Sequence, residues 1–303
     1  FAGNPLLISP ELLLAEGWLA PGSLDRVPRF PPRRIDFGAT IAFKTKLLWR
    51  AFDRFSKQAP VGARQGFEEF RRAQAGWLAE FALFMALKQA HGGVSWSRWE
   101  EELANRRPEA LERSRRELAR ETLFHEFSQY LFCRQWQSLR AEAHRRGVRF
   151  MGDMPIFVAH DSADVWSHPE LFALAEDHSP AVQSGVPPDY FSATGQLWGN
   201  PLYRWEVLAR EGYAWWIDRF RTVLSLVDVV RLDHFRGFEA YWEVPGGDRT
   251  AERGRWVKGP GASFFVAMEK ALGPLPVVAE NLGVITPEVE ALRARFGLSL
   301  IHI

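Results

Sequence analysis

Two carboxylates, each at the end of a short apolar run, are the side chains of this sequence whose type and spacing could do chemistry. Asp233 ends a run that begins at Val227, and Glu280 ends the run Pro276–Ala279. Such runs are typical of buried parallel strands, which would deliver both acids to one edge of a sheet. Neighbouring strands lie about 4.8 Å apart, so the two carboxylates would come within about 5–6 Å. That separation is typical of glycosidases that cleave with retention.

The residues around the two acids indicate different roles for them. Arg231 lies two positions before Asp233 and on the same face of the strand, where its guanidinium would contact the carboxylate and keep it ionised, as a nucleophile requires. Glu280 follows apolar residues, which would favour the protonated form that a general acid requires. The alternative is purely structural: Asp233 pairs with Arg231 or Arg236, and Glu280 caps the next turn.

Strand and helix patterns alternate in the second half of the chain and predict a parallel sheet covered by helices. We expect strands near 148–151, 227–232 and 277–279, and helices near 206–226, 261–271 and after 286. Helical spacing dominates the first half, with expected helices near 9–17, 39–57, 63–90 and 108–146. The sequence therefore predicts an irregular N-terminal segment with a helical subdomain over 1–147 and a catalytic α/β region over 148–303.

A region without clear periodicity, about 160–205, is expected to form a long loop. Within it, Gly185–Tyr203 gathers aromatic rings, amides and glycines, which would suit a groove for sugar rings. An ordered surface loop with its aromatic rings turned inward is the alternative. Four possible metal ligands lie nearby, at His160, Asp161, Asp164 and His168. Their spacing matches no zinc motif, so we expect a loop and a helix cap there, and no metal.

Composition excludes several classes of function. The net charge of +1 over 303 residues gives no general attraction to nucleic acid or membranes, and the arginines of 106–120 alternate with glutamates. No apolar run approaches the roughly 18 residues of a membrane span, and residues 1–5 do not resemble a signal peptide. Cys133 is the one cysteine, which fits a reducing compartment, and we expect a packed thiol in a cytoplasmic protein.

Four segments in this order resemble the amylomaltases, which are the 4-α-glucanotransferases of the α-amylase clan. They are Gly152–Val158, Gly185–Tyr203, Arg231–Phe238 and Ala279–Gly283. The resemblance implies a (β/α)8 barrel with inserted helical subdomains. It also implies retaining transfer of α-1,4-glucan chains through a covalent glycosyl-aspartate, without a metal or organic cofactor. The implied donor is a maltodextrin or starch-derived glucan, and the implied acceptor is glucose or a maltooligosaccharide.

The same resemblance assigns roles to residues of this chain. Asp233 would be the nucleophile, Glu280 the general acid and base, and Arg231 the group that orients the nucleophile. The residues implied to bind substrate are Asp153, Asp189, Tyr190, Trp198, Asn200 and His234. Asp189 and Trp198 would belong to the loop that covers the acceptor side.

The chain also departs from the family pattern. Asn281 stands where many relatives carry Asp, and Leu298–Ile303 no longer follow the family. The pattern begins where about two barrel strands would have passed, and a third catalytic Asp, expected after a His on a later strand, is absent. We therefore expect an incomplete barrel with about three barrel strands, inactive by itself. A hydrolase that transfers to water and a noncatalytic glucan-binding module remain the alternatives.

Overall fold

The computed structural model describes residues 1–301, and the chain forms two compact units. The helical unit comprises Ala2–Gly93 and Pro108–Glu142. The sheet unit comprises Phe1, Val94–Arg107 and the residues from Ala143 onward. The division therefore differs from a single boundary at residue 147, because residues 94–107 group with the sheets.

The helical unit is held together by aromatic rings on three of its helices. Its helices are α1 (Pro10–Ala15), α2 (Phe37–Gln58), α3 (Val61–Ala73), α4 (Leu78–Ala90), α6 (Pro108–Glu117) and most of α7 (Ala119–Arg145). Phe55 of α2, Phe67 of α3 and Phe127 of α7 are buried, with ring centroids 4.6–6.0 Å apart. Burying rings of this size supplies much of the apolar driving force that a bundle of short helices needs.

Three helices expected from the sequence are each divided in two. The helix expected over 63–90 ends at Ala73 and restarts at Leu78, with Gly76, which lacks helix propensity, in the break. The helix expected over 206–226 is α9 (Trp205–Arg210) and α10 (Ala214–Leu226), separated at Tyr213, whose φ of 58° no helix accepts. The helix expected over 108–146 is interrupted between α6 and α7.

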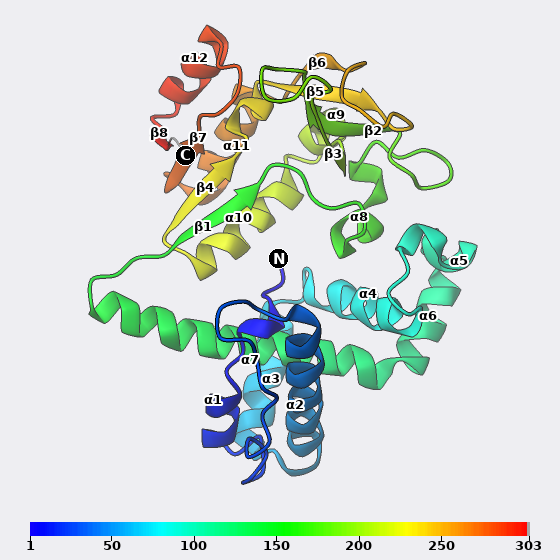
Figure 1. Ribbon diagram of the computed structural model, residues 1–303, viewed down its shortest axis with the longest axis vertical. Coiled ribbons are helices and arrows are strands. Elements are labelled where there is room, and N and C mark those ends of the chain that lie inside the picture. The colour runs from blue at the N-terminus through cyan, green and yellow to red at the C-terminus, as the bar shows by residue number, and fades with distance from the viewer. Residues whose placement is uncertain (302–303) are drawn as a thin grey trace. The chain divides into compact units, whose positions relative to one another are not determined.

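Four parallel strands form the first sheet of the sheet unit. They are β1 (Met151–Pro155), β4 (Val229–Asp233), β7 (Val277–Glu280) and β8 (Ser299–Ile301), in the order β1-β4-β7-β8. Helices α10, α11 (Ala262–Leu272) and α12 (Pro287–Arg295) alternate with these strands, as the sequence predicted (Figure 1). The sheet is open and has one strand more than the three expected. That strand comes from the segment 298–303, of which residues 302 and 303 lie outside the described part.

A second sheet is antiparallel, and two of its strands lie within the region 160–205, which was expected to be a loop. Its strands are β2 (Val182–Val186), β3 (Gln196–Pro201), β5 (Ala240–Pro245) and β6 (Arg255–Lys258), in the order β3-β2-β5-β6. The prediction of one long loop over 160–205 was therefore wrong, since these residues also contain α8 (Ala163–Ser167). Figure 1 shows this sheet on the side toward which the arrowheads of β1 and β4 point, so its strands lie near the carboxyl ends of the parallel sheet.

A cluster of buried aromatic side chains forms the core of the sheet unit. Trp216 and Phe220 of α10 meet Phe238, Phe264 and Phe265, and all five are less than 2 % exposed. The 3-10 turn Phe235–Phe238, which directly follows β4, contributes to this cluster. The aromatic core therefore anchors the turn that begins two residues beyond Asp233.

Candidate active site

The register of the parallel sheet places the two predicted acids beside each other. Leu232 of β4 pairs with Ala279 of β7, so the next residues, Asp233 and Glu280, end their strands at the same level. Carboxyl ends of parallel strands are the usual position of catalytic groups in α/β barrels. The structure thus brings together the two carboxylates that the sequence singled out.

Arg231 connects these acids through a single guanidinium. Its Nη2 lies 3.0 Å from Oδ1 of Asp233 and 3.8 Å from Oε1 of Glu280. Its Nη1 lies 2.6 Å from Oδ1 of Asp153 on β1, which pairs with Arg231 in the register. The two contacts to Nη2 place an upper limit of about 7 Å on the separation of these carboxylate oxygens, a limit that is compatible with the roughly 5–5.5 Å of retaining glycosidases.

The surroundings of Glu280 differ from those of Asp233. Glu280 is 5 % exposed, whereas the side chain of Asp233 is 37 % exposed. Burial and the negative charge of Asp233 raise the pKa of Glu280, and the His234 backbone N–H and Arg231 oppose that rise. A buried carboxyl with a raised pKa beside an accessible carboxylate is the arrangement that separates a general acid from a nucleophile.

His234 and Trp198 close one side of this site. The rings lie edge to face, with centroids 4.8 Å apart, and the His234 side chain is buried. Burial and the nearby charge of Arg236 lower the pKa of His234 to about 4, so the imidazole is neutral at neutral pH. Trp198 lies on β3 and is 37 % exposed, which leaves part of the indole face open to solvent.

The remaining predicted substrate-binding residues contribute less directly. Asn200 fixes the chain locally, since its Nδ2 donates to the carbonyl of Val158 at 3.0 Å. The carboxylate of Asp189 accepts the N–H groups of Phe191 and Ser192, each at 2.8 Å, and is engaged within its own turn. Tyr190 is fully exposed at that turn. The structure therefore brings Asp153, through Arg231, and His234 to the two acids, and it brings Trp198 to the ring of His234. Among the described residues, it shows no contact of Asp189 or Tyr190 with the acids.

Two contributors were not identified from the sequence. The backbone N–H of His234 donates to Oε2 of Glu280 at 3.0 Å, and Gly237 leaves the space that the His234 ring occupies. A β-carbon on Gly237 would stand 3.0 Å from Cδ2 of His234 and 2.8 Å from Cδ1 of Ile156. The backbone N–H of His234 could not be identified from residue types. Gly237 could have been, because a glycine within a run of bulky residues indicates that other atoms approach its backbone closely.

The other candidate groups have local partners. Nε2 of His160 lies 2.7 Å from the carbonyl oxygen of His178, and Nδ1 of His168 lies 3.4 Å from Glu170. Within residues 1–301, no three side chains that could ligate a metal are gathered together. Burial raises the pKa of Cys133 to about 11, which keeps it a thiol.

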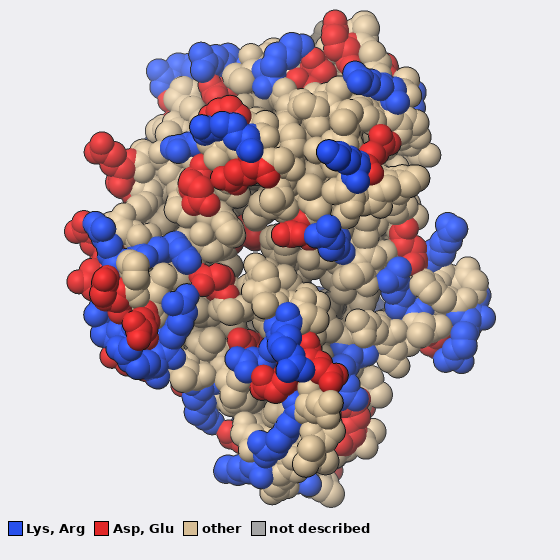
Figure 2. Space-filling view, turned by 180° about the vertical axis from the view of Figure 1, so that it is seen from behind, with Lys and Arg blue, Asp and Glu red and all other residues tan. Residues whose placement is uncertain are grey.

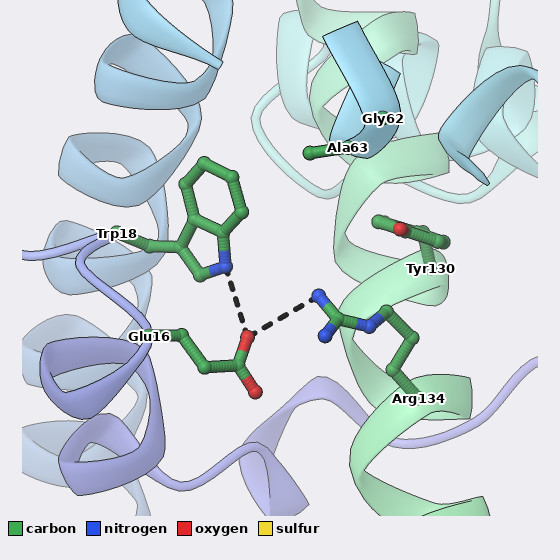
Figure 3. A pocket seen from close by; sticks show the side chains of 6 residues that line it. All are labelled: Glu16, Trp18, Gly62, Ala63, Tyr130 and Arg134. Atoms are coloured by element: carbon green, nitrogen blue, oxygen red, sulfur yellow. Dashed lines mark hydrogen bonds and ion pairs between the residues drawn. The ribbon is translucent and has the colours of Figure 1, made fainter. Parts of the chain in front are cut away.

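A small pocket of about 380 Å³ in the helical unit is lined by paired groups (Figure 3). Oε2 of Glu16 accepts from Nε1 of Trp18 at 2.9 Å and from Nη1 of Arg134 at 3.2 Å.

On the face drawn in Figure 2, basic and acidic side chains are interspersed. Of the helices that the structure describes, none has the length and apolarity needed to cross a membrane.

Comparison with known proteins agrees with this geometry. The sequence model of the family described as 4-alpha-glucanotransferase matches residues 1–303. The chain belongs to the 4-alpha-glucanotransferase family. The 4-alpha-glucanotransferases of Synechocystis and Thermus thermophilus are 53% and 54% identical to it, over 99% and 98% of the chain.

A solved member of the family has the same fold. The amylomaltase from Streptococcus agalactiae, in complex with acarbose, superposes with a TM-score of 0.94 at 36% identity and covers 99% of this chain. The open parallel sheet with its inserted helices is therefore part of the amylomaltase fold. The chain spans about 60% of the length of that structure and of the Synechocystis and Thermus relatives.

Proposed function

We propose that this chain carries the nucleophile and the general acid of a retaining 4-α-glucanotransferase. The observation that carries the proposal is the shared contact of Asp233 and Glu280 with one nitrogen of Arg231, at the ends of two neighbouring strands. The names of the related proteins and the family match support the same reaction class. The substrates are a maltodextrin or starch-derived donor and a glucose or maltooligosaccharide acceptor.

In the first half-reaction, the Asp233 carboxylate attacks the anomeric carbon of a donor glucosyl unit. The bond from that carbon to the glycosidic oxygen breaks, and the proton of Glu280 passes to the departing oxygen. A glycosyl ester of Asp233 and a shortened glucan result. The raised pKa of Glu280 favours the protonated form that this step needs.

In the second half-reaction, Glu280 acts as a base. Its carboxylate takes the proton of the acceptor 4-hydroxyl while the hydroxyl oxygen attacks the anomeric carbon and the ester bond to Asp233 breaks. Both residues return to their starting protonation states. Arg231 stays charged throughout and stabilises the carboxylate that is released. We propose that Trp198 covers the acceptor and limits the entry of water, which its partial exposure beside His234 supports.

Incubation of the full natural polypeptide with maltotriose tests the reaction class. Transfer produces both longer and shorter oligomers, hydrolysis produces only glucose and maltose, and a binding module leaves maltotriose unchanged. The assignment of the acids is tested with Glu280→Gln and an α-glucosyl fluoride donor, whose leaving group needs no proton. We expect mass spectrometry to find a glucosyl adduct on Asp233, and none in Asp233→Asn. Glu269, an exposed residue of α11, provides the matched control: Glu269→Gln should transfer glucan from maltotriose at the wild-type rate.

We also propose a cytoplasmic location, which the free Cys133 supports. The potato and Arabidopsis relatives are named chloroplastic or amyloplastic, so the compartment differs within the family. Fractionation of the source cells with an antibody against this chain tests the location, and recovery with the membrane or secreted fraction would contradict it.

A further inference from the structure

His234 occupies an unusual backbone conformation directly after the proposed nucleophile. Its φ is 51° and its ψ is 48°, which lie in the left-handed region that bulky residues seldom adopt. The residue follows the last position of β4 and precedes the 3-10 turn Phe235–Phe238. Because the conformation is unfavourable for a residue with a β-carbon, the surrounding structure must hold it in place.

The His234 N–H points toward Glu280, as the strand that precedes it dictates. Val230 of β4 donates its N–H to the carbonyl of Pro276 just before β7, and alternate residues of a strand donate toward the same neighbour. His234 lies four residues beyond Val230, so its N–H faces β7 as well. There the acceptor is the side-chain Oε2 of Glu280, at 3.0 Å in a buried setting.

Two neighbours hold the His234 ring and thereby the backbone. The indole of Trp198 meets the imidazole edge to face, with centroids 4.8 Å apart. Gly237 has no side chain where a β-carbon would press on the ring at 3.0 Å. Among residues 1–301, the buried Nε2 of the imidazole has no hydrogen-bond partner. The polar contribution of His234 to Glu280 comes from the backbone N–H.

The hydrogen bond distinguishes the two oxygens of Glu280. Oε2 accepts the His234 N–H, whereas Oε1 faces Nη2 of Arg231, 3.8 Å away, on the side of Asp233. A carboxyl oxygen that already accepts a hydrogen bond is the poorer position for the acid proton. The proton of the neutral acid therefore belongs on Oε1, toward the nucleophile.

We infer that His234 is a positioning residue for the proposed transfer reaction. Its backbone N–H, at a residue held in the left-handed conformation, places the Glu280 proton on Oε1 at the side of Asp233. This inference rests on the proposed function only for its consequence on rate. The hydrogen bond and its effect on Glu280 are properties of the folded chain. The charged groups that also act on Glu280 are Asp233 and Arg231 on β4 and Asp153 on β1.

The test uses variants ranked by tolerance of the left-handed conformation. His234→Gly and His234→Asn accept it, whereas His234→Val, which is β-branched, does not. Since the N–H stabilises the carboxylate, its loss should raise the pKa of Glu280 by about one unit, the effect of one charge-assisted hydrogen bond. The alkaline limb of the pH profile of kcat/KM for maltotriose should move upward by that amount in the Val variant alone. Its kcat should fall roughly tenfold at neutral pH through the misplaced proton.

Infrared titration separates this inference from the proposed function. The C=O stretching band of protonated Glu280 is identified by its loss in Glu280→Gln. This band should titrate at a higher pH in His234→Val, and at the wild-type pH in the Gly and Asn variants. His178→Val is the matched control, because His178 also has a positive φ (64°) and its described contacts outside its own turn are with His160 and Trp96. Equal behaviour of the Gly, Asn and Val variants in both measurements would overturn the inference, whether or not the protein transfers glucan.

Discussion

Arg231 and Asp153 join across the β1–β4 pair, with 2.6 Å between Nη1 and Oδ1. Asp153 holds one nitrogen of the guanidinium, which leaves the other for Asp233 and Glu280. The side chain of Arg231 is 15 % exposed and that of Asp153 is 58 % exposed, so the pair lies where the site opens to solvent. A planar guanidinium can serve three carboxylates at once because its donors point in fixed, separate directions.

Arg231→Lys should therefore impair the reaction severely although the charge is kept. One ammonium cannot reach all three acids, so we expect kcat/KM for maltotriose to fall about 10²-fold, as for the loss of one electrostatic group in an active site. The exposed Arg221, which pairs with Asp218 within α10, provides the control Arg221→Lys, which should retain full activity. A drop of less than threefold in Arg231→Lys would show that charge alone suffices.

The raised pKa of Glu280 implies a cost to the stability of the chain. Below the unfolded-state pKa near 4.5, Glu280 is protonated in both the folded and the unfolded chain. As pH rises from there through the higher folded-state pKa, the unfolded chain loses this proton more readily than the folded chain does. The unfolding free energy should therefore fall over this window. Glu280→Gln avoids the ionisation, so its Tm should exceed that of the wild type at pH 7, with the difference vanishing at pH 4. Thermal melts at several pH values check this, and a Tm difference that grows toward low pH would contradict it.

Trp198 offers a test of water exclusion. Trp198→Ala removes an indole that is partly open to solvent beside His234, so water should compete better for the glycosyl ester. We expect the ratio of hydrolysis to transfer, measured from maltotriose products, to rise several-fold, while donor binding changes less. Trp256→Ala is the control, since Trp256 is similarly exposed (41%) on the same sheet but packs on Arg236. An unchanged product ratio in Trp198→Ala would remove Trp198 from the acceptor side.

The parts of this site that the sequence predicts are those with a local signature. The strands before Asp233 and Glu280 are apolar runs long enough to recognise, and their common end follows from the rules of parallel sheets. The contact of Arg231 with Asp233 follows from their spacing, and its short distance confirms that prediction. The roles assigned to these residues stay predictions until the variants are measured.

The antiparallel sheet had no such signature. β2 (Val182–Val186) is a run of Val, Gln, Ser, Gly and Val, yet three of its residues are buried. Gln183 is satisfied there by three backbone carbonyls, those of Pro245, Gly246 and Asp248. A buried strand whose polar groups are paired by distant segments cannot be recognised from hydrophobic alternation. β8 has only three residues, which is too short for a recognisable pattern. The left-handed conformation of His234 could not be predicted either, because it depends on a tertiary contact with Trp198.

Two adjacent glycines test this unexpected sheet directly. A β-carbon on Gly246 would fall 1.8 Å from the carbonyl oxygen of Pro180, whereas one on Gly247 would meet nothing within 4 Å. The Gly246 N–H also donates to Ala181 at 3.0 Å, so the two segments cannot separate freely. Gly246→Ala should lower the unfolding free energy by about 1–3 kcal/mol, as overpacking does, and Gly247→Ala should change it by no more than about 0.5 kcal/mol. Chemical denaturation of both variants measures the difference. Equal stabilities would mean that the turn after β5 (Ala240–Pro245) does not pack against residues 180–181, and the assignment of this region as a sheet would then fail.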